Sequence, residues 1–533
     1  MTNSLREIPL SEAYLVIGSN TTVNHPVIGS MLKKQVIHHG KKLVVVDPRE
    51  IELAKYADVY LQIKPGTNIA IMNGFAHIAI KEDLYDKEYV KTRCEGFDEM
   101  AQALEKYTPE HVAEICGLDD PQQIVKAARI LAESKPMAIY YCMGVTQFKS
   151  GVNAVKTIAN LQMILGNIGV PGAGVNPLRG QNNVQGACDM GALNAVYPAY
   201  QPVASEDNMK KFKEAWNATT EMSVKPGLTI VESLNAAIEG KVKGLYIMGE
   251  NPVMSDPDQK HVLEAFEKLP FVVVQDIVMT ETAEQADVVL PARAFLEKDG
   301  TVSNTERRVQ MMHKVVEPAG ESMDDWWITM QIANRMGASW NYNSPEEIFE
   351  EIRKVTPSYA GITYERVEKE LLQWPCPNEE HPGTQFLHKD KFTRGLGLLS
   401  PIEYTAPAEE VDPEYPVILT TGRMLEHFHT GSMSRNSRIL TEIENEAYVE
   451  ITPNDASNYN ISDGEMVSVS TRRGSIRLKA KISNMPKSKD WEKLKITSNG
   501  IRPKKKDTNI NPIMPPFFLG TPSLQLIKEK TFK

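Results

Sequence analysis

Short apolar runs alternate with a helical pattern in the first part of the chain. YLVIGSN (14–20) and KKLVVVDPREI (41–51) contain continuous apolar runs, which are typical of parallel strands buried on both faces. Between them, PVIGSMLKKQVIHHG (26–40) places apolar residues at helical spacing and ends on a glycine. The order strand, helix, strand predicts a βαβ unit of the doubly wound α/β class.

The same pattern returns later in the chain. LYIMGEN (245–251) and PFVVVQDIVMT (270–280) match the two apolar runs, and the phrase ELAKYADV (52–59) returns as ETAEQADV (281–288). Each unit is expected to contain a strand, a Gly-x-Asn turn, a helix, a strand, an acidic residue, a short helix and a further strand ending near Ala-Asp-Val. IYYCMGVTQF is expected to add a strand to the first sheet.

The repeated units have two interpretations. Strands of this class bind nucleotides at their carboxyl ends, with phosphates near helix N-termini and an acidic side chain accepting from a ribose or base edge. One chain would then hold two nucleotide moieties, one in each unit. Neither unit has a G-x-G-x-x-G fingerprint. An old duplication, in which Gly and Asp serve only turns, is therefore the alternative.

The segment NPLRGQNNVQGACDMGALN (176–194) is rich in Gly, Asn and Gln. Its single cation is Arg179 and its single anion is Asp189. A polar surface loop is one interpretation. The other is a binding site for a small carboxylate, since the guanidinium fork binds both oxygens of such a group.

Composition narrows the function classes. A length of 533 residues predicts three or four domains at about 150 residues each. The net charge of −10, without a basic stripe, argues against nucleic acid. No apolar run approaches the roughly 18 residues that a bilayer requires, and the N-terminus lacks signal-peptide features, so a cytoplasmic protein without membrane insertion is expected. The five cysteines form no C-x-x-C, so no metal or Fe–S spacing is present.

The Arg179 segment, with GVTQFKSGVNAVKTIANLQMILGNIGVPGAGV (144–175) before it, resembles the molybdenum- or tungsten-dependent formate dehydrogenases. These belong to the bis(molybdopterin guanine dinucleotide) oxidoreductases. The likeness runs from near residue 1 to about residue 480. It includes LEKDGTVSNTERRVQ (296–310) and TTGRMLEHFHTGSMS (420–434).

The resemblance implies one molybdenum or tungsten held by two pterins, each ending in a guanosine nucleotide, and one repeated unit for each half. It implies that Arg179 is the catalytic residue that clamps formate while a hydride leaves its carbon, giving carbon dioxide. By position, the residues implied for one nucleotide are Gly18, Asn20, Asp47, Arg49, Gly66 and Asn68, and those for the other are Gly249, Asn251, Gln275, Asp276 and Thr280. Further implied cofactor contacts are Gly144, Gln181, Asn183, His427, His429 and Thr430. A plain turn at Gly144 and a packing role for the two histidines remain alternatives.

The sequence departs from the family at both ends. The family begins with a cysteine-rich [4Fe–4S] domain and a Cys-His or selenocysteine-His pair, whereas MTNSLREI resembles the segment just after that pair. The cluster and the protein ligand of the metal are therefore expected outside this sequence. Either an in-frame UGA selenocysteine codon lies just upstream, or a separate gene encodes the Fe–S domain. From about residue 483 onward the usual pattern is lost.

Three regions are expected. They are a first dinucleotide-binding α/β domain over 1–180, a second over 181–405 and a β-rich barrel-like cap over 406–533. The leading hypothesis is the catalytic-subunit body of a formate dehydrogenase that works with an electron-transfer subunit. The alternatives are a non-catalytic molybdopterin-binding scaffold subunit, or a related oxidoreductase that acts on another small oxyanion.

Overall fold

The computed structural model describes residues 1–533 except 257, 473, 484–492, 498–522 and 529–533, and for 493–497 and 523–528 only the backbone course is described. The chain divides into two compact units. One combines Met1–Leu178 with Phe386–Lys533, and the other is Arg179–Gln385. The three-region partition 1–180, 181–405 and 406–533 stays a prediction. Most of the divergent segment after residue 483 lies outside the described residues.

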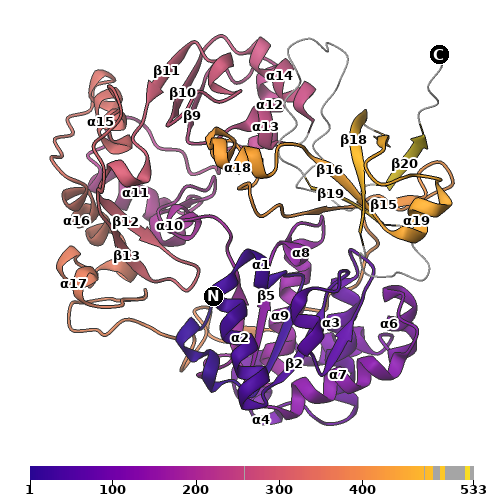
Figure 1. The fold of residues 1–533 in the computed structure, drawn as a ribbon. Coiled ribbons are helices and arrows are strands. Elements are labelled where there is room, and N and C mark those ends of the chain that lie inside the picture. Colours follow the sequence, from indigo (N-terminus) through magenta and orange to yellow (C-terminus); the bar gives the residue numbers. More distant parts are fainter. Residues whose placement is uncertain (257, 473, 484–492, 498–522, 529–533) are drawn as a thin grey trace, which may run out of the picture. The chain divides into compact units, whose positions relative to one another are not determined.

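The first unit is built on a parallel sheet with strand order β3-β2-β1-β5-β6. Along β1 (Ala13–Ile17), Ala13, Leu15 and Ile17 pack with helices α3 (Asn68–Lys81), α7 (Pro121–Glu133) and α9 (Gly151–Ile164). Tyr14 and Val16 pack with α2 (Pro26–His39) on the opposite face. This explains the continuous apolar run, because both faces of the strand are buried (Figure 1). The strands are β1 Ala13–Ile17, β2 Lys42–Val46, β3 Val59–Leu61, β4 Cys94–Glu95, β5 Met137–Tyr141 and β6 Gly174–Pro177.

Helices flank this sheet where the periodicity predicts them. The expected helix over 26–40 is α2, which ends at His39 before Gly40. The helices are α1 Thr21–Asn24, α2 Pro26–His39, α3 Asn68–Lys81, α4 Lys87–Arg93, α5 Phe97–Leu104, α6 Pro109–Cys116, α7 Pro121–Glu133, α8 Met143–Thr146 and α9 Gly151–Ile164.

The C-terminal part of the first unit is rich in strands, as predicted. Its strand order, β15-β19-β16-β18-β17-β20, closes on itself through the pairing of β15 with β20. Alternate residues of β17 and β18, such as Val467, Ile476 and Leu478, point into a shared apolar core. The elements are β14 Gly397–Leu398, β15 Val417–Gly422, α18 Arg438–Ile443, β16 Tyr448–Ile451, α19 Pro453–Asn458, β17 Met466–Thr471, β18 Gly474–Ile482, β19 Lys493–Thr497 and β20 Ser523–Lys528.

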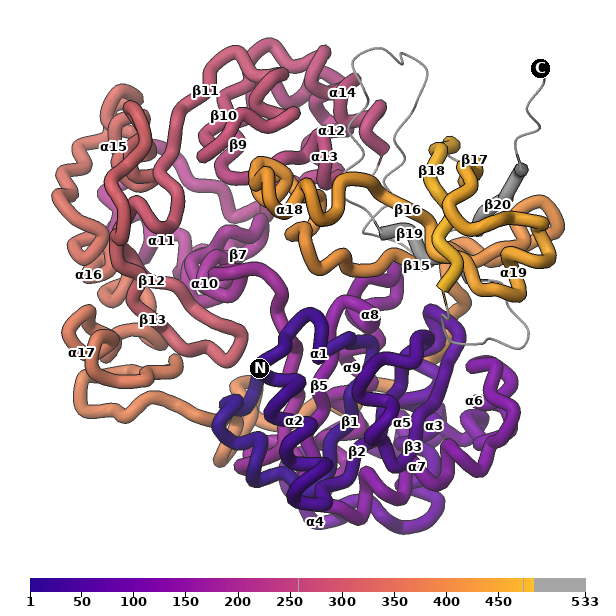
Figure 2. The backbone as a smooth tube through the Cα atoms, viewed as in Figure 1, coloured from indigo at the N-terminus to yellow at the C-terminus, as the bar shows by residue number. Residues whose placement is uncertain are grey.

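The second unit holds a smaller parallel sheet in the order β11-β10-β9 and an antiparallel hairpin of β12 and β13. Short helix α10 lies beside β12 (Figure 2). The strands are β7 Val196–Tyr197, β8 Gln201–Pro202, β9 Leu245–Met248, β10 Val272–Asp276, β11 Val288–Pro291, β12 Gly300–Ser303 and β13 Val309–Met312. The helices are α10 Val184–Asp189, α11 Glu206–Ala215, α12 Ile230–Ile238, α13 Pro252–Ser255, α14 Gln259–Lys268, α15 Asp325–Arg335, α16 Pro345–Val355 and α17 Tyr364–Lys369.

The internal repeat is confirmed, because β1-β2-β3 and β9-β10-β11 follow the same strand order. In each unit, the aspartate of the repeated phrase hydrogen-bonds to a residue at the start of the second strand. Asp58 accepts a hydrogen bond from the amide of Leu43 at 2.9 Å, and Asp287 accepts from the amide of Val272 at 2.7 Å. Each aspartate amide donates back to the carbonyl of the same partner residue. The repeated phrase therefore clasps the start of the second strand in both units.

One detail of the prediction is wrong. The third strand of each unit begins at the valine of Ala-Asp-Val, at Val59 and Val288, and does not end there. The strand runs parallel to its neighbour, and its first residue pairs near the start of that neighbour, Val59 with Val44 and Val288 with Val273. The Asp58 and Asp287 clasps mark that shared starting edge.

Candidate active site

The carboxyl ends of β1 and β5 meet at the point where the strand order of the first sheet reverses. Gly18 follows β1 and Gly144 follows β5, and the amide of Gly144 donates to the carbonyl of Gly18 at 3.0 Å. Gly18 has a φ of +56°, and a Cβ added to it would lie 2.7 Å from the carbonyl carbon of Gly144. Only glycine permits this approach. Ligands of doubly wound proteins bind at such a reversal point.

Asn68, the first residue of α3, joins the two glycines at this edge, because its Nδ2 donates to the carbonyl of Gly144 at 3.2 Å. Asn20 precedes α1 at the end of β1. After β2, the buried Asp47 accepts from the amide of Arg49 at 2.9 Å. The structure thus brings Gly18, Asn68 and Gly144 together.

The loop that carries Gly66 packs elsewhere. A Cβ at Gly66 would lie 2.7 Å from Cγ of Pro407, so this glycine is in close contact with a prolyl ring of its own unit. That contact gives Gly66 a packing role. A cofactor contact at this residue stays a prediction.

The second repeat repeats the glycine turn in more open surroundings. The amide of Gly249 donates to the carbonyl of Gln275 at 2.9 Å, as that of Gly18 donates to the carbonyl of Val46 at 3.0 Å. Gly249 also has a positive φ, +61°, yet no atom lies within 4 Å of an added Cβ. The chain therefore leaves free space at the end of β9.

Asn251, which follows β9, and Thr280, which follows β10, are both buried. Asn251 Oδ1 accepts from the Thr282 hydroxyl at 2.7 Å, and its Nδ2 donates to Glu281 at 2.9 Å. Thr280 Oγ1 accepts from the amide of Ala283 at 3.1 Å. These bonds fix the turn that follows β9 against the turn that follows β10.

The two polar residues at the end of β10 differ in character. Gln275 is fully buried and donates from Nε2 to Asp325 at 2.7 Å, while the Tyr246 hydroxyl donates to its Oε1. Its side chain is thus engaged within the protein. Asp276 accepts from the amide of Ile277 at 2.7 Å, and burial raises the pKa of its carboxyl above the usual range. Asp276 keeps acceptor capacity for a ligand.

Arg179 is held at both its backbone and its side chain. Its amide donates to Thr305 Oγ1 at 3.1 Å, and its Nη1 contacts Sγ of Cys188 at 3.4 Å. Asn183 precedes α10, and its Oδ1 accepts from the amide of Ser303 at 2.9 Å. The hairpin motif LEKDGTVSNTERRVQ therefore fixes the loop that carries Arg179. Gln181 lies exposed on this loop.

Sequence reasoning missed the role of Thr305 and of Asp189, which is almost completely buried. Thr305 is distant from Arg179 along the chain, so no local pattern links the two. For Asp189, the signal was its position as the single acidic residue of the Arg179 segment.

The loop after β15 is a closely bonded turn. His427 is buried, with Nε2 donating to the carbonyl of Glu444 at 2.7 Å and Nδ1 3.2 Å from the hydroxyl oxygen of Ser434. Both ring nitrogens have protein partners, which favours the packing role. Burial lowers the pKa of His429, and Arg423 adds to that effect. Thr430 is buried, with its hydroxyl 3.3 Å from that of Ser432. Cofactor contacts at these three residues stay predictions.

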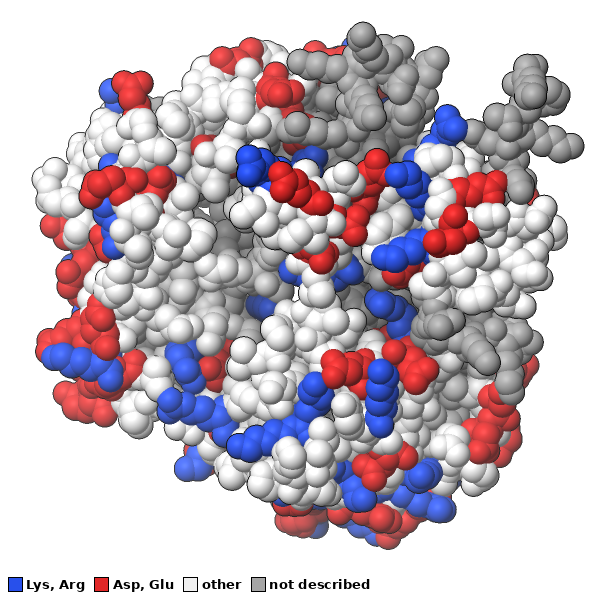
Figure 3. All heavy atoms as spheres, viewed as in Figure 1, with Lys and Arg blue, Asp and Glu red and all other residues white. Residues whose placement is uncertain are grey.

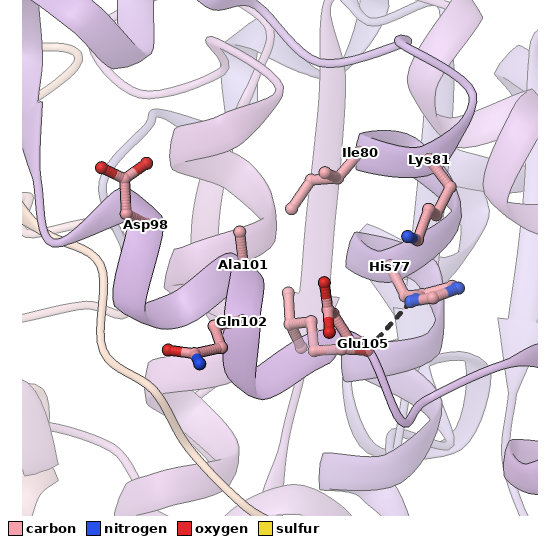
Figure 4. Close-up of a pocket in the computed structure, with 8 residues that line it drawn as sticks. His77, Ile80, Lys81, Asp98, Ala101, Gln102 and Glu105 are labelled. Atoms are coloured by element: carbon pink, nitrogen blue, oxygen red, sulfur yellow. Dashed lines mark hydrogen bonds between the residues drawn. The ribbon is translucent and has the colours of Figure 1, made fainter.

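A pocket between α3 and α5 is lined by His77, Lys81 and Glu105 but contains none of the predicted site residues (Figure 4). The Nδ1 of His77 donates to the carbonyl of Leu104 at 2.9 Å, and burial lowers its pKa. On the face drawn in Figure 3, acidic and basic side chains lie interspersed.

Two absences hold for the part of the chain that the structure describes. There, no three or more His, Cys, Asp and Glu side chains group together in a way that suits a metal ion. No described helix is both long enough and apolar enough to traverse a bilayer.

Two βαβ units, each with a glycine and an asparagine after its first strand, define a doubly wound α/β protein, a class whose ligands bind at the carboxyl ends of the strands. The sequence profile of the molybdopterin oxidoreductase family matches residues 1–335, and that of the molydopterin dinucleotide binding domain matches residues 417–489. The chain belongs to the molybdopterin oxidoreductase family.

Similar proteins carry the comparison further. The chain is 51% identical to the F420-dependent formate dehydrogenase subunit alpha of Methanocaldococcus jannaschii, over 91% of this chain and 71% of that protein. It is 41% identical to formate dehydrogenase H of Escherichia coli, over 91% of this chain and 68% of that protein. The fold matches acetylene hydratase from Pelobacter acetylenicus with a TM-score of 0.75 and 23% identity, over 97% of this chain and 78% of the other.

The residues present fit a molybdopterin guanine dinucleotide. Its phosphates need backbone amides near helix N-termini, and its polar rings need neutral donors and acceptors. The turn at Gly249 leads into the N-terminus of α13, and the Asp276 carboxyl at the end of β10 keeps acceptor capacity. The open space around Gly249 leaves room for a ligand to approach the backbone.

Proposed function

We propose that this chain is the body of a formate-oxidising catalytic subunit. It binds a bis(molybdopterin guanine dinucleotide) with molybdenum or tungsten, one dinucleotide for each repeated unit. Relatives named as formate dehydrogenase alpha subunits, at 45% to 51% identity, support the proposal. The observation that carries it is the fixed position of Arg179, held at its amide by Thr305 and at its guanidinium by Cys188.

Arg179 suits formate for physical reasons. A guanidinium is planar, remains charged at every working pH and presents paired N–H donors to both oxygens of a carboxylate. Binding both oxygens fixes the direction of the C–H bond, which is the bond that must break. Oxidation of formate then yields carbon dioxide, one proton and two electrons. Orientation of this kind lowers the barrier before any chemistry occurs.

When bound, the cofactor supplies the acceptor of the two electrons. The protein supplies binding and orientation. Gly18, Asn68 and Gly144 would hold one dinucleotide, and Gly249, Asn251 and Asp276 the other. The acceptor capacity of Asp276 suits a ribose hydroxyl or the donor edge of a guanine base.

We further infer that the electrons leave through a partner. Two of the relatives are named as alpha subunits, which supports an assembly of several chains. An electron-transfer subunit, or a separately encoded Fe–S domain that also brings the metal's protein ligand, would complete the path. We place the assembly in the cytoplasm.

Replacing Arg179 with Lys tests the proposal in the assembled, cofactor-loaded enzyme. An ammonium on a flexible stem cannot bind both oxygens in one plane, so formate turnover should fall about 100-fold or more. Metal and pterin content should remain unchanged. Formate-dependent reduction of an artificial electron acceptor measures the first, and elemental and pterin analysis measure the second.

Arg335→Lys provides the matched control, because Arg335 is an exposed residue of α15 and, among the described residues, bonds only Gln331 of its own helix. It should retain full turnover. Unchanged turnover in Arg179→Lys would refute the role of Arg179. A wild-type chain that loads the cofactor but never oxidises formate in its assembly would identify the scaffold alternative.

A further inference from the structure

We propose that Asp189 is a positioning residue that holds Arg179 in its formate-binding orientation through helix α10. The inference rests on the proposed function, because it concerns the same guanidinium. Asp189 is the last residue of α10, and Cys188 directly before it contacts the Arg179 side chain. Whatever fixes Asp189 therefore also fixes Cys188.

The carboxylate of Asp189 accepts four hydrogen bonds while it is almost completely buried. Its Oδ1 accepts from Gln185 Nε2 at 2.7 Å and from the Tyr200 hydroxyl at 2.8 Å. Its Oδ2 accepts from the Tyr359 hydroxyl at 2.6 Å and from Trp374 Nε1 at 2.7 Å. A carboxylate offers about four lone-pair positions, so this one is saturated.

No ion pair reaches Asp189 within the described residues, and its four donors are neutral. Three of them are aromatic residues from other elements, and Tyr359 and Trp374 lie 170 and 185 positions away in sequence. The Tyr359 and Trp374 rings are stacked with centroids 6.4 Å apart. Burial, followed by the nearby Asp189 charge, raises the pKa of the Tyr359 hydroxyl, which keeps it protonated as a donor. The carboxylate thus bonds the end of α10 to the side chains of Tyr200, Tyr359 and Trp374, which together form an aromatic wall.

That wall is itself held by the family motif around the β12–β13 turn. Arg307 is almost completely buried, donates to the carbonyls of Trp374 and Thr384, and lies 5.5 Å from the centre of the Trp374 ring. Two residues earlier, Thr305 accepts from the Arg179 amide. One turn therefore fixes the Arg179 backbone directly and the Arg179 side chain through Trp374, Asp189 and Cys188.

Asp189 could instead serve folding alone. The two roles differ in what they predict for Arg179. A folding role changes the stability of the unit and leaves formate binding by the folded enzyme intact. A positioning role changes formate binding by the folded, loaded enzyme. The contact between Cys188 and Arg179 favours the positioning role, because displacement of α10 moves a group that touches the guanidinium.

Two substitutions of Asp189 separate the folding role from the positioning role. Asp189→Ala removes all four acceptor contacts and leaves the Trp374 N–H without its partner. Asp189→Asn can keep one oxygen for Trp374 and Tyr359, while its amide donates to Tyr200 and to a flipped Gln185, because a hydroxyl and an amide can each reverse roles. Asn is therefore the conservative variant. Asp455→Ala is the control, since Asp455 is also buried but its carboxylate accepts from the hydroxyl of Thr452, the residue that caps α19 in the other unit.

The experiment measures formate binding at Arg179 without turnover. The loaded holoenzyme is treated with phenylglyoxal, which modifies guanidinium groups, and modification of the peptide containing Arg179 is followed by mass spectrometry at increasing formate. Formate should protect Arg179 in the wild type. The half-protecting concentration should rise about 10-fold or more in Asp189→Ala, and the KM for formate should rise in parallel. Asp189→Asn and Asp455→Ala should stay within about threefold of the wild type.

The outcomes separate the two proposals. Absence of formate protection in the wild type would overturn the proposed function. Wild-type protection that is unchanged in a folded, loaded Asp189→Ala enzyme would overturn only the positioning role. If Asp189→Ala does not fold, Tyr359→Phe and Trp374→Phe each remove one donor to Oδ2, and an unchanged half-protecting concentration in both would equally overturn it.

Discussion

The two repeated units share a framework and differ in what surrounds it. In both, the glycine after the first strand donates to the end of the second strand, and an aspartate clasps the start of that strand. Gly18, however, packs backbone to backbone against Gly144 of an added strand, whereas Gly249 faces open space. The repeated sequence encodes the framework, and residues outside the repeat decide whether the turn is packed or open.

The first strands of the two units, β1 and β9, differ in burial in the same way. Every residue of β1 is buried, because β5 lies at its side and helices cover both faces. In β9, Tyr246 and Met248 are exposed and only alternate residues face the core formed with α12 and α14. A duplicated βαβ unit can therefore serve as the buried centre of one sheet and as the edge of another.

The largest expected difference between the units concerns the turn glycines. Gly18→Ala forces a Cβ to within 2.7 Å of the Gly144 backbone at a positive φ, and should cost about 3 kcal/mol or more. Gly249→Ala meets no atom and should cost about 1 kcal/mol from the backbone conformation alone. Urea unfolding, followed by hydrogen exchange of peptides from each unit, measures both. Equal losses would remove the distinction between a packed and an open turn.

The aspartate clasps at Asp58 and Asp287 should show a smaller difference in stability between the two units. Asp58→Ala leaves the buried amide of Leu43 unpaired and should destabilise the first unit by about 2 kcal/mol. Asp287 is exposed, so water can replace its carboxylate, and Asp287→Ala should cost about 1 kcal/mol or less. Glu284→Ala, an exposed position of the same repeated phrase, serves as the control. The shift of the urea unfolding midpoint reports each loss of stability. If neither aspartate variant lost stability, the repeated phrase would not hold the strands together.

The smallest effect concerns the half-buried carboxyl of Asp276 at the end of β10. Burial raises the folded-state pKa of Asp276 above its ordinary value of 3.8, so its charged form destabilises the apo protein above the folded pKa. Asp276→Asn should therefore stabilise the second unit at pH 7 by less than about 1 kcal/mol, and this gain should disappear as the pH falls below 3.8.

Thermal unfolding of wild type and variant across this pH range measures the Asp276 effect. A gain that persists in acid would show that its origin is not the charge. If the carboxylate is kept for a ligand, the same variant should also lose cofactor during gel filtration, which connects the stability cost to binding.

How far the sequence predicts this structure depends on the range of each interaction. The helix over α2 and the strands of both units follow local periodicity, and the start of α16 follows from Ser344, whose hydroxyl accepts from the amide of Glu347. These features depend on neighbours within a few residues. Local patterns therefore suffice for the framework.

The rest of the fold and of the candidate site depends on hydrogen-bond partners that sequence spacing does not reveal. Asp189 is a single acidic residue in a polar segment until Tyr359 and Trp374 surround it, and nothing near Arg179 indicates Thr305. For His427 the sequence leaves a cofactor contact and a packing role open, and its bonds to Glu444 and Ser434 through both ring nitrogens are visible only in the structure. The third strand of each unit was placed too early because the clasping role of the aspartate is visible only across strands.

The central claim is that two matching units of one chain each hold one guanine dinucleotide of a shared metal cofactor. Acid release of guanosine monophosphate from the purified, loaded chain, quantified against molybdenum plus tungsten, tests it most directly. The account predicts two guanosine nucleotides for each metal atom and one metal atom for each chain. A ratio of one nucleotide per metal, or the absence of guanosine nucleotide from a metal-loaded chain, would contradict it.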